Sequence, residues 1–361
     1  MKPTLALYEL GQSLWLDNIT RPLLRSGTLA GWIDEYSLSG LTSNPSIFDK
    51  AIENSSDYDS DIAAGLERRD SPEEIFFSLA IDDLRAAADL FAPIHERTAG
   101  VDGWVSLEVS PLLADETQAT IKAALRLHRQ AGRENLFIKI PGTPSGVPAI
   151  EEAIFQGVPI NVTLLFSQDQ YQAAAEAYLR GLERRVEAGL SPDVASVASL
   201  FVSRWDKAVS DSVPQDLRDR IGIAAAHQTY RAYRKLLNSA RWLRLQNLGA
   251  RPQRALWAST STKDPKAPDT LYVAALAAPL TVNTMPDGTM QAFADHGVVG
   301  DPLSDDASEA DAVLAALGRS GTDPAELAQR LQREGAESFD KSWRSLLSSI
   351  EGRAKQMARA S

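Results

Sequence analysis

Residues 136–140 read Leu-Phe-Ile-Lys-Ile, so three aliphatic side chains share one face of a predicted strand while Phe137 and Lys139 share the other. Other segments alternate in the same way, with aliphatic residues on one face and polar residues on the other: Leu14–Asp17, Val105–Val109 and Ile160–Leu164. A half-exposed antiparallel strand would show the same pattern. Here long helical stretches separate the segments, which favours a parallel sheet in which both faces of each strand are covered. We therefore expect the aliphatic faces to contact helices and the polar faces to line an enclosed interior.

The strand-like segments recur along most of the chain: Ser13–Asp17, Ser39–Asn44, Trp104–Val109, Asn135–Ile140, Pro159–Leu164, Ala195–Ser199, Arg254–Ser259 and Leu280–Met285. Helical periodicity separates nearly all of them, over about 71–90, 116–132, 168–188 and 203–247, the first with a capping box at Ser71–Glu74. Eight alternating units predict an α/β fold of the (β/α)₈ TIM-barrel type.

The C-terminal part continues with helical patterns only, over about 305–317, 323–331 and 336–350. We therefore expect a barrel catalytic domain over 1–303 and a helical C-terminal extension over 304–361 that packs on the barrel.

Composition narrows the chemistry available to the 361-residue chain. The absence of Cys and the scatter of the four His exclude disulfides, a cysteine nucleophile and clustered metal ligands. A net charge of −11 argues against broad nucleic-acid binding. The longest apolar stretch, near 274–280, is far shorter than the roughly 20 residues of a membrane span, and the N-terminal residues do not resemble a signal peptide. We expect a cytoplasmic protein without a metal, as a monomer or a homodimer, that relies on amines, carboxyls, hydroxyls and amides.

Lys139 is the candidate nucleophile, because a barrel interior would desolvate its amine and so favour the reactive neutral form. Attack on a ketone would give a Schiff base, whose cationic nitrogen accepts the electrons of a breaking carbon–carbon bond. Glu108 and Asp17 could supply the general acid and base for these steps. The alternative is a core lysine that serves only as the ion-pair partner of one of these carboxylates.

Further polar residues follow the predicted strands. Asn44, Asn161 and Thr163 could bond to substrate hydroxyls and order a water. Arg204, near a helix N-terminus, could bind a phosphate, or it could instead pair with Asp206. The loop Ser259-Thr260-Ser261-Thr262-Lys263 lies where barrels often bind phosphate, although a plain polar loop would look the same.

Several stretches resemble the transaldolase family, in the family's order and over about residues 10–300: Thr42-Ser43-Asn44-Pro45-Ser46, Phe137-Ile138-Lys139-Ile140-Pro141, Asn161-Val162-Thr163-Leu164-Leu165-Phe166-Ser167 and Phe201-Val202-Ser203-Arg204. The resemblance implies a transferase of the non-oxidative pentose phosphate pathway that works without a cofactor. It would move a dihydroxyacetone unit from sedoheptulose 7-phosphate to glyceraldehyde 3-phosphate, giving erythrose 4-phosphate and fructose 6-phosphate.

The resemblance also assigns roles. Lys139 matches the family's Schiff-base lysine, and Glu108 and Asp17 match its acid/base pair. Asn44, Asn161 and Thr163 match its polar pocket, in which the threonine is catalytic. Ser199, Arg204 and Ser259 match positions that contact substrate hydroxyls and phosphate. The chain departs from the family at Ser261, where many members have a second phosphate-binding Arg, and Lys263 could reach the same phosphate. Two rivals stay open: a Schiff-base aldolase acting on fructose 6-phosphate or a related sugar phosphate, and a catalytically silent metabolite-binding barrel.

Overall fold

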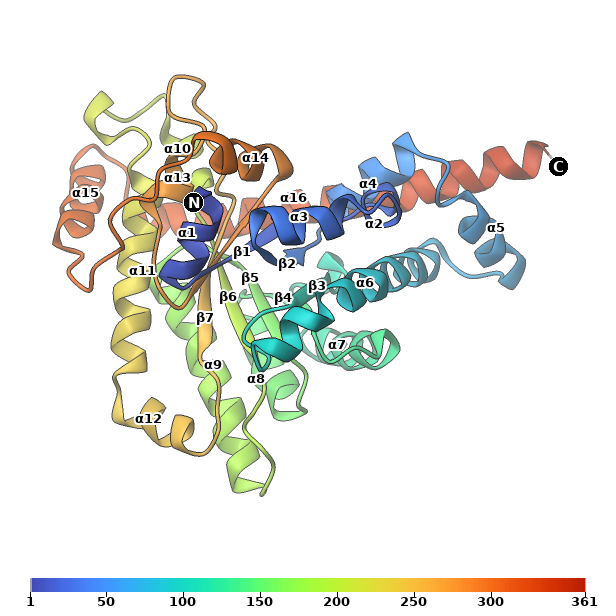
Figure 1. Ribbon diagram of the computed structural model, residues 1–361, viewed down its shortest axis with the longest axis horizontal. Helices are drawn as coiled ribbons and strands as arrows, with labels where there is room; N and C mark the ends of the chain where they lie inside the picture. The colour runs from blue at the N-terminus through green and yellow to red at the C-terminus, as the bar shows by residue number, and fades with distance from the viewer. Residues whose placement is uncertain (1, 361) are drawn as a thin grey trace.

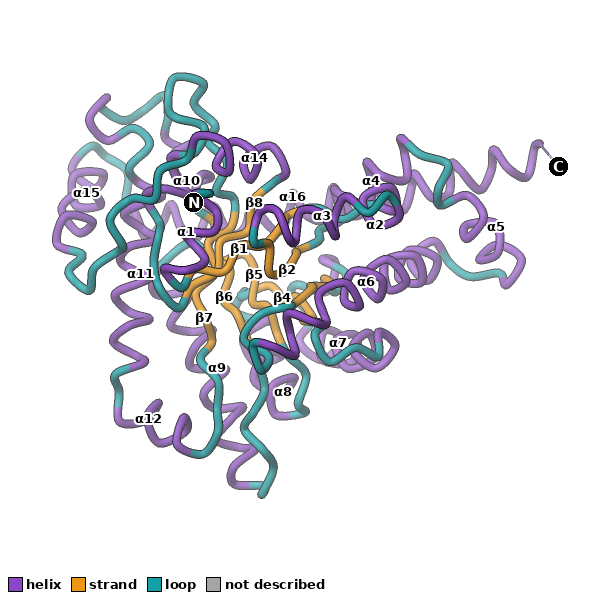
Figure 2. The backbone as a smooth tube through the Cα atoms, in the orientation of Figure 1, coloured by secondary structure: helices purple, strands orange, loops and turns teal. Residues whose placement is uncertain are grey.

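Eight parallel strands close into a barrel in chain order in the computed structural model, which describes residues 2–360 (Figures 1 and 2). The strands are β1 (Gln12–Asp17), β2 (Leu38–Thr42), β3 (Trp104–Glu108), β4 (Leu136–Pro141), β5 (Ile160–Leu165), β6 (Ser196–Phe201), β7 (Gln253–Ala258) and β8 (Thr281–Met285). Each strand pairs in parallel with its neighbour, and β8 closes on β1. This confirms the predicted (β/α)₈ barrel, and every predicted strand segment overlaps an observed one.

Helices surround this barrel (Figure 2). Up to β5 they are α1 (Pro3–Leu10), α2 (Arg21–Arg25), α3 (Thr28–Tyr36), α4 (Pro45–Asn54), α5 (Asp59–Arg68), α6 (Pro72–Arg97), the 3₁₀ turn Pro111–Leu113, α7 (Thr117–Ala131) and α8 (Gly146–Phe155). After β5 they are α9 (Gln168–Glu187), α10 (Ser203–Val209), the 3₁₀ turn Gln215–Leu217, α11 (Ile221–Leu237), α12 (Ala240–Asn247), α13 (Leu271–Ala275), α14 (Asp287–His296), α15 (Ser308–Arg319) and α16 (Pro324–Ala360). The predicted capping box at the start of α6 is confirmed, since Ser71 and Glu74 each bond to the other's backbone N–H. Among the described residues, no helix is long and apolar enough to cross a membrane.

Two helix predictions were wrong in their boundaries. The region 203–247 is three helices, because Pro214 interrupts it and Ser239 caps a new helix by accepting from Trp242 N–H. The segments predicted at 323–331 and 336–350 are one helix, the 37-residue α16. It continues through Gly335, where an added Cβ would lie 3.0 Å from Leu164 Cδ2, so close packing favours a glycine at a position where glycine otherwise weakens a helix.

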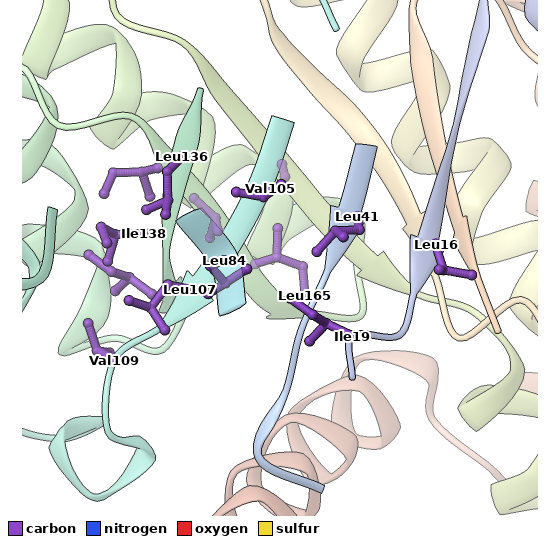
Figure 3. Close-up of a cluster of buried hydrophobic side chains, with 14 of the residues drawn as sticks. Leu16, Ile19, Leu41, Leu84, Val105, Leu107, Val109, Leu136, Ile138 and Leu165 are labelled. Carbon is purple, nitrogen blue, oxygen red and sulfur yellow. The ribbon is translucent and has the colours of Figure 1, made fainter. Parts of the chain in front are cut away.

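The aliphatic strand faces form the core between barrel and helices. Figure 3 shows Leu16, Leu41, Val105 and Ile138 in this layer together with Leu84 of α6. All of them are almost fully buried. This burial is the main source of the fold's stability.

The opposite strand faces fill the barrel itself. Trp104 stacks on Phe137 with ring centroids 4.1 Å apart, and Trp15 lies 6.0 Å from Phe137. Each ring precedes a charged residue by two or four positions on its own strand: Asp17, Glu108 or Lys139. The aromatic side chains therefore form a packed layer inside the barrel, directly below the polar residues at its carboxyl end.

Helix α16 crosses the barrel and continues alongside α4, with the C-terminal end projecting beyond it (Figure 1). Near its start, Gln332 Nε2 donates to the carbonyls of Gly142 and Leu164, both at 3.0 Å. Further along, the Trp343 ring packs 5.0 Å from that of Phe76, and Ser349 donates to Asp49 at 2.8 Å. The helix thus joins the carboxyl ends of β4 and β5 to helices α4 and α6.

Candidate active site at the carboxyl end of the barrel

Lys139 lies in the interior of β4, and its side chain is 7% exposed. Its Nζ donates to Glu108 Oε2 at 3.2 Å and to the Ser43 carbonyl at 3.1 Å. Strand register places Glu108 and Asn161 directly beside it on β3 and β5. The amine is therefore held by a carboxylate and a carbonyl in a largely desolvated position, as a nucleophilic lysine requires.

The Glu108 carboxyl is almost fully buried, and desolvation raises its pKa against the opposing attraction of Lys139. Only one of its oxygens is engaged: among residues 2–360, Oε1 has no hydrogen-bond partner. A carboxyl with a raised pKa and a free oxygen can exchange a proton with substrate or water.

Asp17 ends β1 on the other side of the cavity. Thr42 Oγ1 donates to its Oδ1 at 2.9 Å, and Asn44 Nδ2 lies at 3.5 Å. Burial raises the pKa of the Asp17 carboxyl, while Lys139 and the Thr42 hydrogen bond oppose that shift. Asn44 also accepts from Ile47 N–H, so one side chain both caps α4 and faces the cavity.

Three polar residues lie on β5 and β6. Thr163 Oγ1 is buried and, within the described part of the chain, has no hydrogen-bond partner. Ser199 Oγ donates to Asn161 Oδ1 at 2.7 Å, and Asn161 Nδ2 donates to Ser106 at 3.2 Å. Thr163 and Ser199 line the cavity, whereas the fully buried Asn161 fixes the orientation of Ser199.

Arg204 enters the cavity from α10. The predicted alternative, an ion pair with Asp206, is not formed: Asp206 accepts from Tyr272 and from the N–H groups of Ile221 and Gly222. Arg204 forms no ion pair with any residue from 2 to 360, and burial lowers the pKa of its guanidinium. A partly buried guanidinium that faces a cavity and has no ion-pair partner among the described residues is suited to an anionic ligand.

Ser259 and the loop after β7 lie next to Arg204. Ser259 has a left-handed φ of 56°, which is strained for a residue other than glycine, and its Oγ lies 2.9 Å from Ser203 Oγ. Lys263 donates to Ser261 in the same wall. Desolvation, then the positive charges of Lys207 and Arg204, lower the pKa of the Lys263 amine.

These groups surround one cavity of ≈ 200 Å³ at the carboxyl end of the barrel, where barrel enzymes place their active sites. The structure thus brings all the predicted site residues together. Seven of them line the cavity: Asp17, Asn44, Lys139, Thr163, Ser199, Arg204 and Ser259. Glu108 and Asn161 lie behind the wall and bond to Lys139 and Ser199.

Sequence reasoning missed two parts of the wall. Thr42 and Thr284 form a hydroxyl pair, 2.8 Å apart, beside Asp17. Ser338, Phe339 and Ser342 reach the cavity from α16, more than 130 positions beyond Arg204. The signal available for α16 was Gly335, a glycine inside a helical pattern, which indicates a close approach to another part of the chain.

The chain is similar to known proteins over nearly its whole length. Residues 14–350 match the family model described as transaldolase/fructose-6-phosphate aldolase. A transaldolase of Parafrankia sp. (strain EAN1pec) is 46% identical over 358 residues, which cover 97% of each chain.

Similar proteins occur outside that genus. A transaldolase of Thermobifida fusca (strain YX) is 44% identical, with 99% of this chain and 98% of the relative covered. One from Trichodesmium erythraeum (strain IMS101) is 40% identical and covers 98% of both chains.

Proposed function

The chain belongs to the transaldolase/fructose-6-phosphate aldolase family and functions as a transaldolase, and from this premise we propose how its own residues carry the reaction. The enzyme transfers a dihydroxyacetone unit from sedoheptulose 7-phosphate to glyceraldehyde 3-phosphate. The observation that carries the residue assignment is the buried Lys139 amine, 3.2 Å from Glu108, in the wall of a cavity that also contains Asp17 and Arg204.

In the first half of the reaction, the Lys139 amine adds to C2 of the ketose and forms a carbinolamine. Glu108, through a water held with Thr163, protonates the departing hydroxyl, so that one water leaves and an iminium ion remains. The raised pKa of the Glu108 carboxyl supports this role, because it makes the protonated form accessible.

Cleavage of the carbon–carbon bond and transfer of the dihydroxyacetone unit follow, on the side of the cavity where Asp17 lies. Asp17 removes the proton of the C4 hydroxyl, the C3–C4 bond breaks, and its electrons move into the iminium to give an enamine on Lys139. The aldose phosphate leaves, and the enamine carbon then adds to the aldehyde of glyceraldehyde 3-phosphate, whose oxygen takes up a proton. Water adds to C2 of the resulting iminium, and the carbinolamine collapses to release fructose 6-phosphate and to restore the Lys139 amine. Asn44 and Ser199, the latter oriented by Asn161, would bond to the hydroxyls of the bound unit.

The phosphate would lie between Arg204, Ser259 and Lys263. Lys263 takes the place of the family's second arginine, which is Ser261 here, because its amine lies in the same wall and is repelled by Arg204. A phosphate dianion would relieve this repulsion. The binding partners are phosphorylated sugars and not nucleic acids or membranes, and the enzyme acts in the cytoplasm. Residues 1–303 form the barrel domain, and residues 304–361 form the extension that packs on it.

Borohydride reduction in the presence of fructose 6-phosphate tests the assignment, since it converts an iminium into a stable secondary amine. We expect peptide mass analysis to find the label on Lys139 and to find none in the Lys139→Ala variant. A label on another lysine, or no label, would overturn the assignment. Product analysis with and without glyceraldehyde 3-phosphate distinguishes the transferase from the rival aldolase, which would release free dihydroxyacetone in both cases.

A further inference from the structure

One side chain of α16 faces both ends of the proposed substrate site. The Phe339 ring centroid lies 5.9 Å from Lys139 Nζ and 5.9 Å from Arg204 Cζ. These are the groups that would hold C2 and the phosphate. Phe339 is 9% exposed and packs in the same apolar cluster as Leu164, Phe166 and Phe201. An apolar ring therefore lies against the cavity between the nucleophile and the phosphate-binding cation.

The helix that carries this ring is anchored on both sides of it. Before Phe339, Gln332 bonds to the backbone at the ends of β4 and β5, and Gly335 allows the helix backbone to approach Leu164 and Arg204 closely. After Phe339, Trp343 packs on Phe76 and Phe77. The position of the ring is thus fixed relative to the strand that carries Lys139.

We propose that Phe339 is a positioning residue that excludes water from the Lys139 Schiff base, and so directs the bound dihydroxyacetone unit to transfer rather than to hydrolysis. This inference rests on the proposed function, because it concerns the intermediate that Lys139 would form. An apolar wall offers water no hydrogen bond, so water beside the imine carbon is disfavoured on this side. The ring also presents a π face to a cation, which suits an iminium as well as an ammonium ion.

Two fates compete for the intermediate. In transfer, the enamine carbon forms a bond to the acceptor aldehyde, whose oxygen takes up a proton. In hydrolysis, a proton returns to the enamine carbon, water adds to the resulting iminium carbon, and the carbinolamine collapses to free dihydroxyacetone and the Lys139 amine. Both routes end when one water releases the ketone from Lys139, but in transfer the bond to the acceptor forms before that water adds. Access of water to the imine of the three-carbon unit, before the acceptor has reacted, therefore shifts the ratio of the two products.

The test measures two rates with fructose 6-phosphate as donor: release of dihydroxyacetone without an acceptor, and formation of sedoheptulose 7-phosphate with erythrose 4-phosphate as acceptor. We expect Phe339→Ala to raise the ratio of hydrolysis to transfer about tenfold, equivalent to about 1.4 kcal/mol between the two barriers. Phe339→Leu, which restores an apolar wall, should recover most of the ratio of the unmodified enzyme.

Leu346→Ala is the matched control, because Leu346 is fully buried on the same helix and does not line the cavity. It should lower the melting temperature without changing the ratio. An unchanged ratio in Phe339→Ala, or an equal rise in Leu346→Ala, would overturn the role of Phe339. Borohydride trapping at Lys139 in the unmodified enzyme separates this result from failure of the proposed function, which would show no label there.

Discussion

Two buried ion pairs lie inside the same barrel, one at each end. At the carboxyl end, Lys139 pairs with Glu108 at 3.2 Å; at the amino end, Arg254 pairs with Asp102 at 3.0 Å and also donates to Ser13 at 2.8 Å. The rings of Trp15, Trp104 and Phe137 lie between them. Both pairs are nearly inaccessible to solvent, yet only one adjoins the polar cavity at the carboxyl end of the barrel.

The difference between the pairs lies in the cation and in what is left unbonded. A guanidinium cannot lose its proton in a protein, and its fork bonds to two partners at once, which suits a fixed structural contact. An amine can give up its proton and then act as a nucleophile, and Glu108 retains one free oxygen beside it. Burial of charge therefore does not by itself indicate catalysis; a removable proton and a free acceptor do.

Replacing the lysine of the carboxyl-end pair by arginine tests this difference most strongly. Lys139→Arg keeps the positive charge and the contact with Glu108, but it removes the nucleophile. We expect kcat to fall by at least about 10⁴-fold, or about 5.5 kcal/mol, because no imine can form. Steady-state kinetics and a thermal melt check this: retained activity, or a collapse of the melting transition, would contradict the assigned role.

The amino-end pair should respond in stability and not in catalysis. Arg254→Met leaves the Asp102 carboxylate buried without its cation, so we expect unfolding in urea to show a loss of about 3–5 kcal/mol. The double variant Arg254→Met, Asp102→Leu should recover most of this loss, and kcat of the folded enzyme should stay within about twofold in both. A large change in kcat with intact stability would mean that the amino end takes part in the reaction.

Arg204 extends the comparison to a guanidinium that forms no ion pair with any residue from 2 to 360. Arg204→Ala should raise KM for phosphorylated donors about 30-fold, or about 2 kcal/mol, since one charge-assisted contact to phosphate is lost. Donors without phosphate should change by less than about threefold, and Arg204→Lys should recover part of the affinity for phosphorylated donors. Equal losses on both classes of donor would indicate that Arg204 is structural.

Asp206 is a third kind of buried charged group, because N–H and O–H groups donate to its carboxyl and no cation of the described residues pairs with it. The smallest expected effect on stability is at this residue. Burial raises the pKa of this carboxyl to about 6, from 3.8 in an unfolded chain. Between these values the folded protein holds a proton that the unfolded chain has lost, so this contribution to stability falls as the pH rises through 6.

The Asp206→Asn variant lacks that titration. Its melting temperature relative to the unmodified protein should therefore increase by about 2 °C between pH 4 and pH 7. Calorimetry at matched ionic strength measures the difference, and a difference that is constant over this range would show that Asp206 does not titrate there.

The barrel and the polar side of its interior could be predicted from the sequence, because strand alternation is local and the residues beside Lys139 lie at fixed register. Asp17, Glu108 and Lys139 each end or nearly end a strand, and parallel strands bring such ends together. The unbroken α16 and its contribution to the site could not be predicted. Phe339 lies among Ser, Asp and Lys residues, and its burial depends on Gln332 and Gly335 reaching groups far away in the chain.

The order of the elements along the chain has a consequence for synthesis. Helix α16 follows β8, so the ribosome makes every strand and Lys139 before the 37 residues that carry Phe339. At elongation rates of about 5–20 residues per second, synthesis from the end of β8 to Phe339 takes about 3–11 s. Until Phe339 is in place, the contacts with Glu108 and the Ser43 carbonyl are the ones that would hold the amine.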